Sequence, residues 1–583
     1  MNTDSTRPAA TRFRPFFQNV KLLALLSALG LQSHGLSASA EPAEPEPGAM
    51  AQLVQMLVEQ KTLTPAQGEL LLRAAAAEKA AQAAPAPAAA TAESVPEKVP
   101  GRMSVRYLPA TAKAQLREEI KQEVMAQARE ENWAAPRAFP EWTSRFRPFG
   151  DARLRFETIG FPDDNDPTGQ VDFNSINQGS PFEANLVNGY PALHNTHADR
   201  NRLRLRARLG AEVDLEENFS LGARIATGSD NSPVSTNQTL GADGFGSKYA
   251  LWLDRVFFKY EVPGLGGKAL TLLAGRFDNP FFSTDLIWDD DLGFDGLAAT
   301  YRHDRIGRVR PFLTAGAFPV YNTSLNLSTR QPGKFKSDDR WLYGVQLGAD
   351  IELAEKLNLK LGVAWYDYTN IAGKLSRPLT DSTLPGDTDS RRPAFAQKGN
   401  TYMKLRDNQY LPTDPAFNRY DYQYYGLATP FSELALTAKL DIKHFAPFHL
   451  SVDAEFVKNL AYDEGRINRH GAQNNIKPLP SNDVDSGDLG WLVRLNLGDP
   501  VLEKRWDWQV NVGYRYLEAD AVVDGFADSD FGLGGTNLEG YFLGGSLALS
   551  KRVWTRLRWM SADNIGGSPY SVDVFQFDLN ARF

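Results

Sequence analysis

The stretch Arg202-Leu203-Arg204-Leu205-Arg206-Ala207-Arg208-Leu209 alternates arginine with an aliphatic residue at every position. The same alternation continues as far as Leu215, with acidic residues taking the place of arginine. Successive side chains of a β-strand point to opposite faces. The segment is therefore predicted to be one long strand with an apolar face and a charged face.

The two-residue period recurs throughout the chain after Gly150, for example from Leu434 to Ile442 and from Trp506 to Tyr516. A soluble antiparallel sandwich can show the same pattern, with its apolar face in the core. The predicted strands, however, have about 9 to 15 residues, whereas globular strands average five or six. Tilted transmembrane strands need about 9 to 11 residues. Tryptophan and tyrosine near the ends of the apolar faces also match the aromatic girdles of membrane barrels.

Connections between the predicted strands alternate between short and long. Short connections lie near residues 216–217, 264–267, 304–305, 354–355, 446–447, 500–503 and 550–551. Long connections lie at about 159–198, 228–247, 278–292, 319–339, 370–430, 460–487, 519–537 and 562–570. This pattern predicts an all-β transmembrane fold, an antiparallel up-and-down β-barrel of about 16 strands over residues 141–583. Because unpaired backbone groups in lipid are costly, the first strand, Asp151 to Thr158, must pair with the last, Val572 to Phe583.

The N-terminal part of the chain of 583 residues follows a different pattern. Basic residues up to Lys21, an apolar run from Leu22 to Leu31 and the small-residue triplet Ala38-Ser39-Ala40 predict a signal peptide over residues 1–40. The alternative is a buried helix of a cytosolic protein. No apolar run approaches the roughly 20 residues that a membrane-spanning helix needs.

Residues 41–140 are predicted to form a small α-helical extension in the periplasm. Residues 41–100 read as a helical hairpin followed by an Ala/Pro-rich linker. Within residues 101–140, apolar residues recur every four positions from Leu116 to Ala128, which predicts a helix with one apolar stripe. This stripe is compatible with a coiled coil and equally with a helix packed on the periplasmic mouth of the barrel.

Composition disfavours several classes of function. The net charge of −8 gives no support for nucleic-acid binding, and cysteine is absent. The seven histidines are scattered, and no catalytic set, metal-ligand spacing or phosphate-binding loop is recognisable, so no enzymatic activity, metal or cofactor is predicted. Asp163-Asp164-Asn165-Asp166 resembles part of a calcium loop but lacks its later glutamate, and a solvated loop is the preferred interpretation.

Four segments resemble known bacterial proteins. The segment from Gly150 to Glu157 resembles the opening strand of Gram-negative porins, and Phe575 to Phe583 is similar to the terminal strand of outer-membrane proteins, which ends in phenylalanine. Pro140-Glu141-Trp142 and the run from Phe281 to Asp291 resemble the family called putative porins. The resemblance implies a diffusion channel in the bacterial outer membrane and a homotrimer. It implies no particular solute.

A barrel of this size leaves a water-filled channel lined by the face opposite lipid. Because arginine at the lipid midplane costs about 2–4 kcal/mol, the strand arginines are expected to face the pore. The predicted pore-lining arginines are Arg202, Arg204, Arg206, Arg208, Arg255, Arg308 and Arg310, and the same register turns Arg153, Arg155, Arg224, Arg494, Arg515, Arg556 and Arg558 inward. Their density suggests a preference for anions.

The third long connection, about 278–292, carries Asp285, Asp289, Asp290 and Asp291. It corresponds in order to the loop that folds into the lumen of trimeric general porins. We therefore hypothesise a constriction with these carboxylates on one side and the arginines on the other. In the alternative, the loop stays outside and its aspartates are solvated or bind a divalent cation at the surface.

These features predict a porin that lets small hydrophilic solutes or ions, including anions, diffuse across the outer membrane. Two rival functions remain open. One is a solute-specific channel with a binding site in the constriction. The other is a structural tether, in which residues 50–132 reach from a lipid-embedded barrel to the cell wall or to envelope proteins. A hydrolase is disfavoured because the catalytic set is missing.

Overall fold

The computed structural model describes residues 141–583, except residues 186–188, 243, 264–269, 382, 410–419, 479 and 482. The predicted signal peptide, the helical hairpin with its linker, and the helix of residues 101–140 lie outside the described residues. None of the helices within the described part of the chain has the length and hydropathy that crossing a membrane requires.

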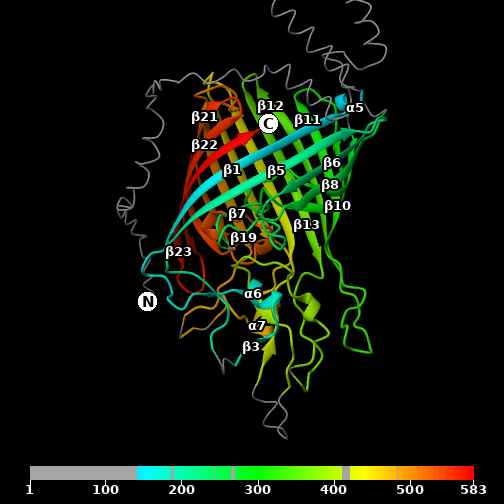
Figure 1. The fold of residues 1–583 in the computed structure, drawn as a ribbon, viewed down its shortest axis with the longest axis vertical. Coiled ribbons are helices and arrows are strands. Elements are labelled where there is room, and N and C mark those ends of the chain that lie inside the picture. Colours follow the sequence, from blue (N-terminus) through cyan, green and yellow to red (C-terminus); the bar gives the residue numbers. More distant parts are fainter. Residues whose placement is uncertain are drawn as a thin grey trace, which may run out of the picture. The chain divides into compact units, whose positions relative to one another are not determined.

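Sixteen antiparallel strands close into one barrel (Figure 1). A further two-residue strand, β7 (Gln238–Thr239), pairs with the side of β5 and brings the sheet to 17 strands. The barrel strands, in order, are β1 (Phe146–Gly160), β5 (Arg200–Asp214), β6 (Phe219–Ala226), β8 (Trp252–Glu261), β9 (Leu270–Asp278), β10 (Gly293–Arg302), β11 (Val309–Tyr321), β12 (Arg340–Ala354), β13 (Leu357–Thr369), β17 (Ser432–Ile442), β18 (His449–Asn459), β19 (Leu489–Gly498), β20 (Trp508–Leu517), β21 (Leu538–Ser550), β22 (Val553–Asn564) and β23 (Ser571–Arg582).

The first and last strands close the barrel, as predicted. β1 pairs with β23 from Asp151 opposite Arg582 to Gly160 opposite Asp573. On its other side β1 pairs with β5, and this ladder continues to Phe146 opposite Val213. β1 is therefore longer than the segment from Asp151 to Thr158 that the sequence predicts, because Arg147 and Pro148 also join the ladder.

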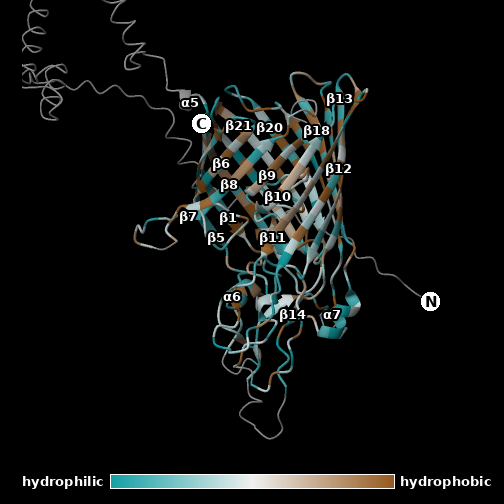
Figure 2. Cartoon of the chain, turned by 90° about the vertical axis from the view of Figure 1, so that its right-hand side faces the viewer, coloured by the Kyte–Doolittle hydropathy of each residue, from teal (hydrophilic) through white to brown (hydrophobic). Residues whose placement is uncertain are grey.

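The alternation along the strands separates an outer from an inner face. On β5, Leu203 and Leu209 are 48% and 52% exposed, whereas the side chains of Arg204 and Arg206 are each 15% exposed. Figure 2 shows hydrophobic and hydrophilic residues alternating along the strands of the barrel wall. A soluble sandwich buries its leucines and exposes its arginines to water. The exposed leucines and partly buried arginines of β5 show the opposite arrangement, which is that of a barrel wall facing lipid.

Short turns gather at one end of the barrel and long loops at the other, which we call the turn end and the loop end (Figure 1). The turns are residues 215–218, 262–269, 303–308, 355–356, 443–448, 499–507 and 551–552. The loops are L1 (161–199), L2 (227–251), L3 (279–292), L4 (322–339), L5 (370–431), L6 (460–488), L7 (518–537) and L8 (565–570). These bounds confirm the predicted alternation within a few residues.

The long loops contain short elements of their own. These are β2 (Gln170–Val171), α6 (Phe173–Gln178), β3 (Phe182–Glu183), β4 (Leu193–His194), η3 (Asp389–Arg391), β14 (Tyr402–Lys404), β15 (Tyr422–Gln423), β16 (Tyr425–Leu427), α7 (Glu464–His470), η5 (Asp524–Phe526) and η6 (Phe531–Leu533). Before the barrel, α5 (Glu141–Ser144) adjoins β1. L1 and L5 are tied together where β3 pairs with β15.

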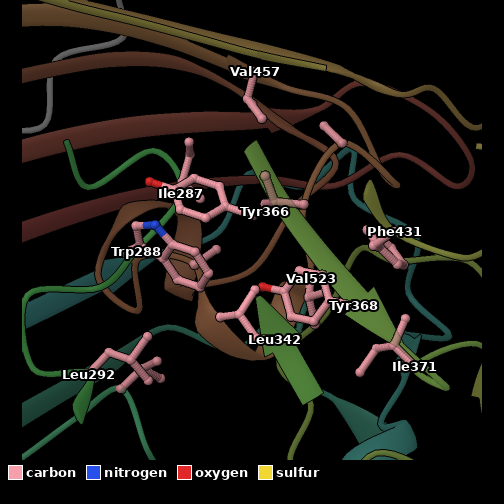
Figure 3. Close-up of a cluster of buried hydrophobic side chains, with 14 of the residues drawn as sticks. Ile287, Trp288, Leu292, Leu342, Tyr366, Tyr368, Ile371, Phe431, Val457 and Val523 are labelled. Atoms are coloured by element: carbon pink, nitrogen blue, oxygen red, sulfur yellow. The ribbon is translucent and has the colours of Figure 1, made fainter. Parts of the chain in front are cut away.

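A hydrophobic cluster fills part of the interior where L3, L5 and L7 meet the wall (Figure 3). Ile287 and Trp288 of L3 and Val523 of L7 are buried there, together with Tyr366 and Tyr368 of β13. The rings of Trp288 and Tyr366 pack edge to face with centroids 5.1 Å apart. The expectation that the whole inner face lines water is therefore wrong for this part of the wall. Here aromatic residues take the place of charged ones, and the loops pack against them.

Candidate functional site

L3 lies inside the barrel and is fastened to the wall at successive points. Near its start, Phe282 exchanges two hydrogen bonds with the side chain of Gln346 on β12, at 2.8 and 2.7 Å. Further along, the backbone N–H and the hydroxyl of Thr284 donate to one carboxylate oxygen of Glu455 on β18, at 3.0 and 2.6 Å. β12 and β18 are separated by β13 and β17, so L3 passes along the inner wall rather than away from the barrel.

The predicted acidic residues of L3 have different partners. Asp285 forms an ion pair with Arg494 on β19. The carboxylate of Asp289 accepts hydrogen bonds from the backbone N–H of Ser529 in L7 and of Asp291, at 2.8 and 2.7 Å, and the N–H of Asp289 donates to Phe526 of L7. Asp289 therefore fastens L3 to L7 instead of lining open space. The side chain of Asp290 is exposed.

Asp291 connects L3 to the arginine strand. Its carboxylate lies 3.5 Å from Arg206 and 3.1 Å from Arg208, and it also accepts hydrogen bonds from Thr236 of L2. The guanidinium of Arg255, which is 1% exposed, donates to the backbone carbonyls of Asp291 and Leu292. L3 is thus held at both ends and in its middle.

The arginines of β5 face carboxylates on β1, and we call Arg202, Arg204, Arg206 and Arg208 the arginine wall. Across the β1–β5 ladder, Asp151 lies opposite Arg208 and Glu157 opposite Arg202. Asp151 forms ion pairs with Arg206 and Arg208 at 2.9 and 2.7 Å, and Glu157 forms one with Arg202. Arg204 is 3.9 Å from Glu157. These four cations share three carboxylates, namely Asp151, Glu157 and Asp291, so one positive charge remains in excess.

Two of the predicted arginines lie apart from this group. Arg310 is the second residue of β11 and is exposed near the turn end, where it lies opposite Asp350 of β12. Arg308 lies in the turn before β11, is exposed, and donates to the carbonyl of Leu353 at 3.2 Å. The inward assignment of Arg308 stays a prediction, because Arg308 lies in the turn and β11 begins one residue later, at Val309.

L7 supplies acidic residues that the sequence reasoning missed. Asp530 accepts from Arg155 of β1 at 2.8 Å and from Arg558 of β22 at 2.9 Å, and Asp528 lies 3.3 Å from Arg515 of β20. The signal was present in the sequence, because Asp528 and Asp530 stand in a long loop as the L3 aspartates do. Nothing in the order of the loops indicated that a second loop enters the barrel.

Neighbouring groups give the L3 carboxylates different acidities. Burial raises the pKa of Asp285, but the charges of Arg494, Arg515 and Arg558 together outweigh burial and lower the pKa below its ordinary value. Burial and the charge of Asp528 raise the pKa of Asp289. The protein atoms around the Asp290 carboxylate displace bulk water without covering it, and with the charge of Asp285 they raise its pKa to about 6.

Within the described residues, no group of three or more histidine, aspartate and glutamate side chains is arranged to hold a metal ion. In L1, the amide of Asn165 donates to the carbonyls of Thr196 and Ser571, at 2.6 and 2.8 Å. Asp166 accepts from Thr168 in its own turn. In the segment that resembles part of a calcium loop, Asn165 thus holds L1 against the rim of the barrel, and Asp166 stabilises its own turn.

Three solved structures of outer-membrane proteins are similar to the chain at low sequence identity. OprB of Pseudomonas putida is 13% identical, with 76% of this chain and 95% of that chain covered and a TM-score of 0.40. The channel DcaP of Acinetobacter baumannii is 11% identical, with 75% and 97% covered and a TM-score of 0.35. OmpF of Salmonella typhi, solved with daunomycin, is 8% identical, with 75% and 97% covered and a TM-score of 0.33. No curated protein matches the chain.

A family model described as "Putative porin" matches residues 47–583. The match covers most of the chain and includes the whole barrel.

Proposed function

Because the chain belongs to the putative porin family and forms an outer-membrane barrel, we propose that it is a channel for passive diffusion of small hydrophilic solutes, narrowed by L3 opposite the arginine wall. The observation that carries this proposal is the contact of Asp291 with Arg206 and Arg208. A loop held in the lumen against charged side chains leaves a polar passage whose width and charge are fixed by the protein.

The excess of positive charge supports a preference for anions. The arginine wall carries four guanidiniums against the three carboxylates that pair with it. Rings and rows of fixed charge raise the local concentration of the opposite ion in a narrow pore. We therefore expect a greater permeability for chloride than for potassium.

The direct test is conductance of the purified protein in a planar lipid bilayer. We expect discrete, ohmic current steps, and in a salt gradient a reversal potential of the sign that anion permeation gives. A protein that folds into the bilayer and produces no steps would contradict the channel, and a cation-selective reversal potential would contradict only the anion preference.

A solute-specific channel is the second candidate, and the hydrophobic cluster favours it. L3, L5 and L7 close part of the interior with Trp288, Phe431 and Val523, so the passage is narrower than the barrel. A narrow passage brings a solute into contact with fixed side chains, which is what selective binding requires. Saturation of the current by one solute would distinguish this channel from a general pore.

We also propose that the channel is a homotrimer, as the family resemblance implies. L2 supports an association of subunits, because it extends away from the barrel wall beside β7 (Figure 2). Phe245 in this loop is fully exposed, and Leu251 at its end is 60% exposed. Burial of these side chains against another subunit would be favourable, because it removes apolar surface from water. A tether function of residues 50–132 stays a hypothesis, since these residues lie outside the described part of the chain.

A further inference from the structure

We propose that a second group of arginines, on β19, β20 and β22, forms a binding site for a small oxyanion, namely the carboxylate of an organic acid or a phosphate group. This inference rests on the proposed channel function and names the class of solute that the channel would retain. The site is separate from the arginine wall of β5, with which it shares neither arginines nor carboxylates.

A cavity against L3 and L7 defines the site. Its volume is about 20 Å³, and it is lined by Asp285, Leu492, Arg494, Asn511, Arg515, Asp528, Phe531, Phe542, Arg556 and Arg558. Four of these ten side chains are guanidiniums, and they come from three strands and point to one space. A cavity of this size has room for about one water molecule or one oxygen atom of an oxyanion, so binding of a whole anion requires the guanidiniums to move apart.

The cations of this cavity outnumber the carboxylates beside them. Asp285 pairs with Arg494, Asp528 with Arg515, and Asp530 with Arg558. Three acidic residues thus face four arginines, and one positive charge remains.

The remaining charge is on Arg556. This residue forms no ion pair among the described residues, although Asp578 lies directly opposite it in the β22–β23 ladder. Both carboxylate oxygens of Asp578 are taken by Arg155, at 2.7 and 3.0 Å. Asp578, the neighbour that would neutralise Arg556, is therefore paired with Arg155 instead.

Unused hydrogen-bond donors point to the same ligand. The Nε atoms of Arg494 and Arg515 are buried and have no hydrogen-bond partner, and Arg515 as a whole is 1% exposed. A buried donor without a partner destabilises the folded protein, and more so when it is charged. An oxyanion brings several acceptor oxygens and a negative charge, and guanidiniums bind such groups in a two-point geometry.

Aromatic rings keep the guanidiniums in place without neutralising them. The guanidinium of Arg515 lies 5.3 Å from the ring centre of Phe531, and that of Arg494 lies 5.5 Å from that of Phe542. Stacking on a ring fixes a guanidinium plane and leaves its charge and its N–H groups available. The charge and the donors that an anion needs are thus present before it binds.

The experiment measures binding of inorganic phosphate, acetate and succinate to the full chain in detergent by isothermal titration calorimetry, with single-channel current in the same solutes as a second readout. We expect at least one of these oxyanions to bind and to interrupt the current. Arg556→Gln should weaken binding about tenfold, the effect of losing one charge-assisted hydrogen bond. Arg552→Gln is the matched control, because Arg552 is exposed in the turn of the same hairpin, and it should bind as the unaltered protein does.

The outcomes separate the two proposals. Binding of phosphate alone assigns the site to phosphate groups, and binding of acetate or succinate assigns it to carboxylates. Absence of binding by the unaltered protein, or equal binding by Arg556→Gln, would overturn the site. If Arg556→Gln fails to fold, Arg556→Lys carries the test, since it keeps the charge but loses the two-point geometry and should still bind more weakly. Binding of an oxyanion without any conductance would support the binding site and contradict the channel function.

Discussion

The guanidinium of Arg155 on β1 donates two hydrogen bonds to the carboxylate of Asp578 on β23, from Nε to Oδ1 at 2.7 Å and from Nη2 to Oδ2 at 3.0 Å. The two residues lie opposite each other where the first and last strands close the barrel. Both side chains are almost completely buried, and Arg155 also holds Asp530 of L7. One ion-pair network therefore joins the closure of the barrel to the position of a loop.

Replacing Asp578 by asparagine should destabilise the barrel. The change keeps the shape of the side chain but removes a buried charge that balances Arg155, and breaking a buried pair in this way costs about 3–5 kcal/mol. The free energy of unfolding can be measured by urea titration in detergent. Glu352→Gln is the control, because the Glu352–Arg305 pair is exposed and should contribute less than about 1 kcal/mol. Equal losses for the two variants would contradict the importance of the closing pair.

Replacing Glu455 by alanine should loosen L3. One oxygen of Glu455 accepts both donors of Thr284, and each hydrogen bond to a charged group contributes about 1.5–3 kcal/mol. We expect the population of displaced L3 to rise at least about tenfold, seen as larger fluctuations of the single-channel current. Thr555→Val, on β22 and away from L3, should leave the current unchanged. A quiet current in the Glu455 variant would show that the other contacts of L3 suffice.

Reversing the charge of Arg208 should shift the ion selectivity toward cations. Arg208 contacts Asp291 at 3.1 Å and Asp151 at 2.7 Å, so Arg208→Glu places a third carboxylate in that group. The ratio of chloride to potassium permeability, obtained from the reversal potential, should fall at least about twofold. Arg330→Glu makes the same charge change at an exposed position of L4 and should have no effect. Unchanged selectivity in the Arg208 variant would show that the arginine wall does not line the path that ions take.

Lowering the pH should strengthen the anion preference through Asp290. The pKa of this carboxyl is about 6, so it is charged above that pH and neutral below it. As the pH falls through about 6, the lumen loses a negative charge and the reversal potential should move further toward that of chloride. Asp290→Asn should show the low-pH selectivity at every pH in this range. A variant that keeps the full pH dependence would assign the effect to another group.

Placing a charge on L2 should weaken the association of subunits. Phe245 is fully exposed, and Phe245→Asp would put a charge where an apolar contact between subunits is proposed. We expect the variant to shift from trimer to monomer when its mass is measured in detergent. Phe583→Asp is unsuitable as a control because Phe583 bonds to Gly150 at the barrel closure. Leu325→Asp changes another exposed residue, in L4, and should remain trimeric.

The barrel could be predicted because its cause is local. Lipid-facing and inward-facing side chains must alternate along each strand. Apolar and polar residues therefore alternate in the sequence, as from Arg202 to Leu209. The lengths of the connections then fix the order of the strands. Alternation does not mark where a strand begins, and Arg308, which it places on a strand, lies in the turn before β11.

The interior was harder to predict because it depends on contacts between distant segments. Trp288 and Tyr366 pack together although they are far apart in the sequence, and on its own strand Tyr366 is only one more aromatic residue. The partners of the arginines, such as Asp530 for Arg155, likewise come from loops whose paths no local pattern specifies. The predicted acidic loop was identified from its order and its charge, whereas its anchors on Gln346 and Glu455 were not.

An even number of strands has a practical consequence for the two ends of the chain. The N–H of Asp214 at the turn end donates to the carbonyl of Arg145, and the N–H of Phe583 bonds back to Gly150, so the polypeptide enters and leaves the wall on the same side. A reporter domain joined before Glu141 would therefore share a compartment with one joined after Phe583. A protease confined to the opposite side could reach the long loops without touching either junction.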